Sequence, residues 1–98
     1  MSRKRLDQIR DKIRLHQYDM TAHATEEMAE DDLDILDVEQ AVLNGEITKI
    51  EKDDLRGTKY VIEGTGADQI TPVGVVGRFA SNDRYLIITV YEVTEPER

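Results

Sequence analysis

The chain has 98 residues, a formal net charge of −8, 35% charged residues, 39% hydrophobic residues and no cysteine. This length suits one domain. The lack of cysteine excludes disulfide scaffolds, thiolate metal sites and cysteine nucleophiles. The acidic balance argues against nucleic-acid binding over the whole surface, because polyanions are bound by positive fields.

No segment has the pattern of a targeting or membrane signal. The basic start, Met1 to Arg5, is not followed by the apolar region of a secretory signal. The longest apolar run, Tyr85 to Tyr91, is interrupted only by Thr89 and is far shorter than the ~18–20 residues that span a bilayer. We therefore expect a cytoplasmic protein that does not contact membranes.

The charge is unevenly distributed along the chain. Residues 1–16 carry a net charge of +4, residues 17–55 carry −11 and residues 56–98 carry −1. The acidic centre, residues 26–39, holds eight acids in fourteen positions. Such a run is typical of solvent-facing helices, and the alternative is an interaction surface for a basic partner or for the basic end of a second copy.

The chain begins with a predicted helix over residues 2–15. Its apolar stripe, Leu6, Ile9 and Ile13, is narrow, so we expect this helix to pack weakly at the periphery. Residues 18–21 follow as a short extended or turn segment.

Two further helices have clear start signals. Thr21 is a candidate N-cap for a short second helix. Asp34 and Asp37 have the spacing of a capping box at the start of a third helix over 35–44. Gly45 is expected to end that helix in the left-handed conformation.

The pattern after Gly45 changes to strands, which we place at 47–52, 58–63, 71–80 and 84–93. Gly74 and Gly77 indicate a bulge or a close backbone approach. The last strand is apolar on both faces, which is typical of a central strand or of a strand whose outer face is covered by something else. The predicted fold is α+β, with N-terminal helices on one face of a four-stranded antiparallel meander. We divide the chain into a basic helix (1–16), one α+β domain (17–93) and a tail (94–98).

Several short motifs between residues 17 and 93 resemble one bacterial family. The helical part reads Y-D-M-T-A-H-A at 18–24, E-E-M at 26–28 and L-N-G-E-I at 43–47. The strand part reads R-G-T-K-Y-V at 56–61 and I-T-V-Y at 88–91. This pattern resembles the family named domain of unknown function 4258.

The resemblance implies a fold related to the RelE/ParE/BrnT group of small toxins. It also implies a toxin-like, RNA-interacting function and an antitoxin-like protein partner. The sequence departs from the family pattern at Glu27 and Asp31, where the pattern has arginine. Each change replaces a cation that suits phosphate with a carboxylate.

Small toxin nucleases of this kind act through Arg, Lys, Tyr and His on the sheet and need no metal. On that basis we take His23, Lys59, Arg78 and Tyr91 as candidate catalytic residues. The structural alternative has His23 bonded to a strand carbonyl, Tyr91 packed and the arginine solvated or paired with an acid. His23, Glu26 and Glu27 offer too few ligands for a metal, so we expect neither a metal nor a cofactor.

The second hypothesis is a non-catalytic acidic module for protein interaction or homodimerisation. Its candidate partner-binding residues are Glu26, Glu27, Glu30 and Asp31. Convergence of His23, Arg78 and Tyr91 in one pocket would favour the enzyme, and their separation would count strongly against it.

Overall fold

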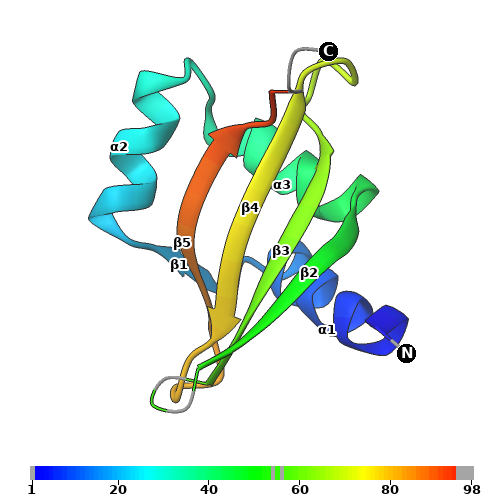
Figure 1. Cartoon of the computed structure of the whole chain (residues 1–98), viewed down its shortest axis with the longest axis vertical. Helices are drawn as coiled ribbons and strands as arrows, with labels where there is room; N and C mark the ends of the chain where they lie inside the picture. The colour runs from blue at the N-terminus through cyan, green and yellow to red at the C-terminus, as the bar shows by residue number, and fades with distance from the viewer. Residues whose placement is uncertain (1, 54, 56, 95–98) are drawn as a thin grey trace.

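The computed structural model of the chain describes residues 2–53, 55 and 57–94. These residues form an α+β fold with three helices and a five-stranded mixed sheet (Figure 1). The helices are α1 (Ser2–Arg14), α2 (Ala22–Glu30) and α3 (Ile35–Asn44). The strands are β1 (Tyr18–Met20), β2 (Glu46–Asp53), β3 (Gly57–Thr65), β4 (Pro72–Phe79) and β5 (Tyr85–Glu92). Arg56 of the strand motif and residues 95–98 of the expected tail lie outside the described residues.

The strand order is β1-β5-β4-β3-β2. Strands β2 to β5 form the predicted antiparallel meander, and β1 adds a fifth strand that runs parallel to β5. The prediction of four antiparallel strands is therefore wrong at 18–20, where an extended segment joins the sheet. Three residues are too few to show an alternating pattern, so no strand could be predicted there from periodicity.

Strand β1 is held by Arg84 at the start of β5. The Arg84 guanidinium donates to both carboxylate oxygens of Asp19, at 2.8 and 3.2 Å, and to the Tyr18 carbonyl oxygen at 2.9 Å. This fork geometry joins two segments that are 65 residues apart in the sequence.

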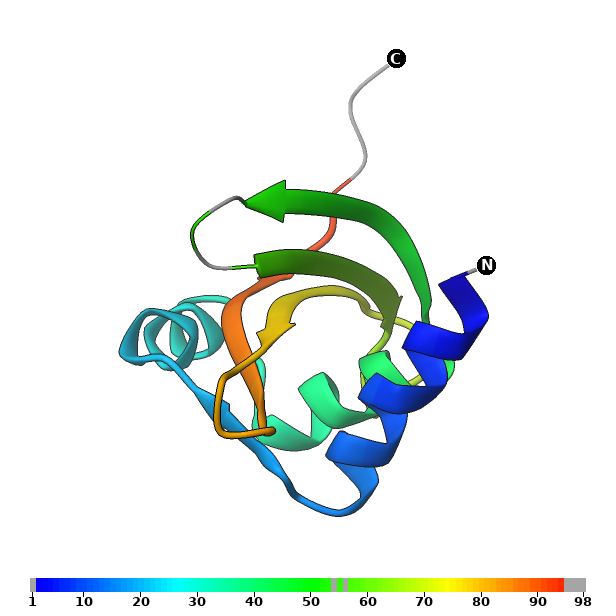
Figure 2. The same ribbon diagram turned by 90° about the horizontal axis from the view of Figure 1, so that it is seen from below.

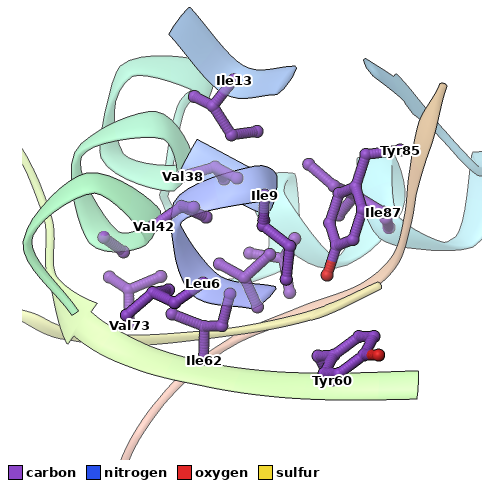
Figure 3. Close-up of a cluster of buried hydrophobic side chains, with 14 residues drawn as sticks. Leu6, Ile9, Ile13, Val38, Val42, Tyr60, Ile62, Val73, Tyr85 and Ile87 are labelled. Carbon is purple, nitrogen blue, oxygen red and sulfur yellow. The ribbon is translucent and has the colours of Figure 1, made fainter. Parts of the chain in front are cut away.

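Helices α1 and α3 lie on the concave side of the curved sheet, and α2 lies beside β5 (Figure 2). The core between them contains Leu6, Ile9 and Ile13 of α1, each at most 1% exposed (Figure 3). The expectation of a weakly packed, peripheral α1 is wrong, because its narrow apolar stripe is fully buried in the core and α1 packs against α3, β2 and β5. None of the helices in the described part of the chain is long and apolar enough to cross a membrane.

Helix α3 begins as predicted. Asp34 accepts a hydrogen bond from the Asp37 backbone N–H at 3.1 Å, and Asp37 accepts one from the Asp34 N–H at 3.0 Å. Gly45 ends the helix in an extended conformation, with φ −93° and ψ −173°, so the expected left-handed cap is wrong. Glycine is required there because a Cβ would lie 2.5 Å from the carbonyl oxygens of Ala41 and Glu63.

Strand β5 is central over its first half, between β1 and β4, in agreement with its apolar sequence. Opposite the step from Val76 to Gly77 of β4, strand β5 has one extra residue, Ile88, and this bulge shifts the alternation of β5 by one residue. As a result, Val90 joins Tyr85 and Ile87 on the core side, where all three are fully buried.

Candidate functional site

The sheet surface turned away from α1 and α3 is called the outer face below (Figure 2). Its residues follow from the strand pairing and from which neighbours are buried in the core. Among them are Glu46, Lys49 and Glu51 of β2, Lys59, Val61 and Glu63 of β3, Gly74, Val76 and Arg78 of β4, and Leu86, Thr89 and Tyr91 of β5.

Three of the four candidate catalytic residues lie on the outer face. Extending the β3–β4 register by one residue places Lys59 beside Arg78 on neighbouring strands. Tyr91 pairs with Gly74, four residues along β4 from Arg78, which corresponds to about 13 Å. The structure therefore brings two cations together and places Tyr91 further along the same face.

The two cations differ in their pairing. The Lys59 Nζ lies 3.8 Å from Glu51 Oε1, while Lys49 Nζ lies 3.0 Å from Glu51 Oε2. The hydrogen bond from Lys49, and then its charge, lower the pKa of Glu51. Arg78 makes no ion pair with any residue that the structure describes. Like charges on facing strands are unfavourable, so a bound anion would stabilise this pair.

Tyr91 lies flat across Gly74 on the outer face. A Cβ at Gly74 would collide with the Tyr91 ring, so the glycine provides the space for it. The Tyr91 hydroxyl is hydrogen-bonded to Glu63 on β3. Burial raises the pKa of Tyr91, and the negative charge of Glu63 raises it further. Tyr91 is therefore held as a neutral hydrogen-bond donor.

His23 does not belong to the outer face. It lies in the first turn of α2, as predicted, with its side chain 65% exposed and its Nε2 3.2 Å from Glu27 Oε2. The described contacts of His23 thus involve its own helix, and none of them reaches Arg78 or Tyr91.

The acidic residues of α2 divide into two pairs. Glu26 and Glu30 are exposed. Glu27 and Asp31 instead accept hydrogen bonds from the backbone N–H groups of β5, at Val90 and Glu92, each at 3.0 Å. Glu27 and Asp31 thus cover an edge of β5 that β1 is too short to reach.

Thr21 begins this edge cover. Its N–H donates to the Ile87 carbonyl oxygen, and its hydroxyl donates to the Ile88 carbonyl oxygen at 3.1 Å. The same hydroxyl oxygen accepts from the Ala24 N–H, so Thr21 is the predicted N-cap of α2. Along this one edge of β5, the backbone of β1 therefore binds the first residues, and the side chains of Thr21, Glu27 and Asp31 bind the residues that follow.

A family model, the domain of unknown function DUF4258, matches residues 20–92. The chain belongs to this family. No curated protein and no solved structure gives a significant match. The resemblance seen in the helical and strand motifs is thereby confirmed, and α1 lies before the matched region of the DUF4258 domain.

Glu27 and Asp31 stand at the two positions where the resemblance described above leads us to expect arginine. A guanidinium has five N–H donors and no acceptor, so it cannot accept the β5 backbone N–H groups that these carboxylates bind. In this DUF4258 chain the two carboxylates have a structural partner within the fold.

Two cations of α1, Arg10 and Lys12, contact other elements of this DUF4258 chain. Arg10 donates to the carbonyl oxygens of Val42 and Gly45 at the C-terminal end of α3, where a cation is favoured. Lys12 Nζ lies 3.3 Å from Asp83 Oδ2.

An open groove of about 480 Å³ lies between α1 and the β4–β5 turn. It is lined by Arg5, Gln8, Asp11, Lys12, Leu15, Gln17, Phe79 and Asp83.

The described residues contain no group of three or more His, Cys, Asp or Glu side chains arranged to hold a metal.

Two residues of the outer face were missed by sequence reasoning. Glu63 bonds Tyr91, and Glu51 bonds Lys59. The strand alternation alone places Glu63 on the face opposite Ile62, but its contact with Tyr91 depends on Gly74 in the strand between them.

Proposed function

We propose that this protein is a toxin-like module that contacts the backbone of RNA with the outer face of its sheet. The observation that carries the proposal is the Lys59–Arg78 pair, two cations on facing strands of a surface that α1 and α3 leave uncovered. An RNA phosphate between them would remove a like-charge contact and add charge-assisted hydrogen bonds.

The local charge of this face supports the proposal despite the net charge of −8. The outer face carries Lys49, Lys59 and Arg78 against Glu46, Glu51 and Glu63, so these charges balance, in contrast to the acidic chain as a whole. The acidic helices α2 and α3 lie beside and behind the sheet. Half-buried Tyr91 adds a ring on the same face on which a base can stack.

The geometry supports backbone binding more strongly than cleavage. Cleavage by the 2′-hydroxyl needs a base, an acid and a stabilising cation at one phosphate. Glu63 and Tyr91 form a base and acid pair, but the register separates them from Lys59 and Arg78 by about 13 Å. His23 contributes to neither end, because it pairs with Glu27 on α2.

The test is binding of a fluorescent single-stranded RNA oligomer, measured by anisotropy at several salt concentrations. Lys59→Ala and Arg78→Ala are each expected to weaken binding roughly three- to tenfold. Each should also reduce the slope of log affinity against log salt by about 0.7, because one phosphate contact is lost. Lys52→Ala is the matched control, since Lys52 is an exposed lysine on the other face of β2.

Equal losses in the Lys52 control, or no RNA binding by the wild-type protein at low salt, would contradict the proposal. A parallel incubation with RNA in the absence of metal asks whether binding leads to cleavage. Cleavage that Arg78→Ala and Tyr91→Phe both abolish, and that His23→Ala leaves unchanged, would extend the proposed function to a metal-independent ribonuclease.

The finer assignment to the RelE/ParE/BrnT group is part of this proposal, together with an antitoxin-like partner. Its support is the order of elements, in which N-terminal helices precede an antiparallel meander whose outer face stays open. Co-expression with the product of the neighbouring gene tests the partner. An antitoxin-like partner is expected to co-purify and to abolish RNA binding.

A second candidate function is protein interaction through the acidic helices. It is favoured by Ile35 and Leu36, which are 41% and 50% exposed next to the exposed acids of the α2–α3 turn. A basic partner that binds here would be released by salt, and Glu30→Lys would weaken it without altering RNA binding.

A further inference from the structure

Strand β2 forms the last strand of the sheet, so one of its edges has no strand beside it in the described part of the chain (Figure 1). Residues 49–52 of this edge read Lys-Ile-Glu-Lys, and Ile50 is 46% exposed. An open edge offers unpaired N–H and C=O groups to another strand. Charges of both signs alternate around Ile50, unlike the uniform lysines that commonly block an edge.

We propose that β2 pairs with β2 of a second copy of this chain, antiparallel and about a two-fold axis at Ile50. The sheet would then continue through both copies as ten strands. A second copy is proposed as the partner because the charges of β2 complement one another in one of the registers that two identical strands can adopt.

Symmetry restricts the registers that two identical antiparallel strands can adopt. Successive residue pairs alternate between hydrogen-bonded and non-hydrogen-bonded types. A two-fold axis must map each pair onto one of the same type, so it passes through a residue that faces its own copy. Only registers centred on a single residue of β2 are therefore possible.

Among these registers, the one centred on Ile50 is electrostatically the best. It places Ile50 against Ile50 and pairs Lys49 of each copy with Glu51 of the other, on the same face. Centring on Lys49 would oppose two lysines, and centring on Glu51 would oppose two glutamates. Opposite charges on facing positions stabilise a strand pair and like charges destabilise it.

The existing contacts of these side chains are compatible with the pairing. Lys49 and Glu51 already contact each other along the strand, with Nζ and Oε2 3.0 Å apart, and Lys49 is 67% exposed. Both side chains therefore stand on the outer face with freedom to turn toward the second copy. Ile50 lies on the opposite face, where contact with its own copy would bury it.

Sedimentation equilibrium of the full chain tests the proposal. A concentration-dependent dimer is expected below about 1 mM, as for a small interface. Lys49→Glu replaces two attractive pairs with two repulsive ones, so it should weaken the dimer by about tenfold or more. The double variant Lys49→Glu/Glu51→Lys restores both pairs and should recover most of that loss. A wild-type monomer at every concentration, or a double variant no better than the single one, would overturn the proposal.

A cysteine test reports on the register itself. The chain has no cysteine, so a single cysteine can form only intermolecular disulfides. Ile50→Cys is expected to cross-link at least about tenfold faster under mild oxidation than Ile70→Cys, because facing Cβ atoms lie about 5 Å apart. Ile70 is 79% exposed in a loop and sets the rate of random collision. Equal rates would overturn the Ile50-centred register even if a dimer forms.

Discussion

The two edges of the sheet are finished in opposite ways. At one edge, β5 is paired by the short strand β1 and then by the side chains of Thr21, Glu27 and Asp31. At the other edge, the eight-residue strand β2 pairs with β3 on one side and has no strand on its other side in the described part of the chain. The first edge is completed by the chain itself, whereas the second is available to another molecule.

The difference shows why the same kind of residue serves different purposes at the two edges. The carboxylates of α2 point at backbone N–H groups and act as substitutes for a strand. The carboxylate of Glu51 on β2 instead pairs with lysines on its own face and leaves the backbone edge open. The acidic residues Glu27 and Asp31 thus complete the hydrogen bonding of one sheet edge, whereas Glu51 belongs to a surface where another molecule can bind.

The largest effect is expected from a matched pair of isoleucine substitutions. Ile87 of the closed edge is fully buried, and Ile50 of the open edge is 46% exposed. Ile87→Ala should lower the free energy of unfolding by about 2–5 kcal/mol, because it leaves a cavity in the core. Ile50→Ala should lower it by less than about 1 kcal/mol. Urea denaturation at dilute protein concentration, where the chain is monomeric, measures both.

If Ile87→Ala does not fold, Ile87→Val provides the same comparison at about 0.5–1.5 kcal/mol. Equal losses at the two positions would mean that the open edge is packed as tightly as the closed one. The contrast between the edges would then be wrong.

A smaller effect is expected when the cover of β5 is opened at one point. Glu27→Ala removes the acceptor of the Val90 N–H, and should cost about 1 kcal/mol because water can partly replace it. The Val90 amide should also exchange its hydrogen faster. Glu27→Gln keeps an oxygen acceptor and should lose less than half as much. Glu26→Ala, on the exposed side of α2, is the control and should leave the Val90 amide unchanged.

The smallest effect concerns the pH dependence of the open edge. Lys49, and to a smaller extent Lys59, hold the pKa of Glu51 below its usual value. A lowered pKa in the folded chain gives a contribution to stability that is complete above about pH 4.3, the unfolded value. That contribution is lost as the pH falls through the lowered folded pKa. Carboxyl NMR of Glu51 should show a midpoint below 4.3, and Lys49→Ala should raise it. A midpoint that Lys49→Ala leaves unchanged would exclude Lys49 as the cause.

Local signals in the sequence account for the parts of the fold that were predicted. The capping box at Asp34 and Asp37 was confirmed because its two partners are three residues apart, within one helical turn. The errors at β1 and at Gly45 have non-local causes. The pairing of 18–20 depends on β5, and the glycine requirement at 45 comes from the carbonyl oxygens of Ala41 in α3 and of Glu63 in β3, the second of which is distant in the sequence.

The candidate site was predictable to a similar extent. Alternation along the strands is a local pattern, and it placed Lys59, Arg78 and Tyr91 on strands whose predicted ends differ from the observed ones by one or two residues. The hydrogen bond from Val90 to Glu27 joins residues 63 positions apart, so no spacing in the sequence could indicate it. The four catalytic candidates and the four partner-binding acids therefore remain predictions whose roles await the RNA and partner experiments.

The contact of Arg10 with the end of α3 has a consequence for where the molecule can be divided. The family match begins at residue 20, inside β1, and so leaves out α1, Arg10 and two residues of the strand. A fragment cut there would lose the side chains of Leu6, Ile9 and Ile13 from the core and leave the last carbonyl oxygens of α3 without their cation. The unit that is recognised by comparison of sequences is thus shorter than the unit that can be expected to fold.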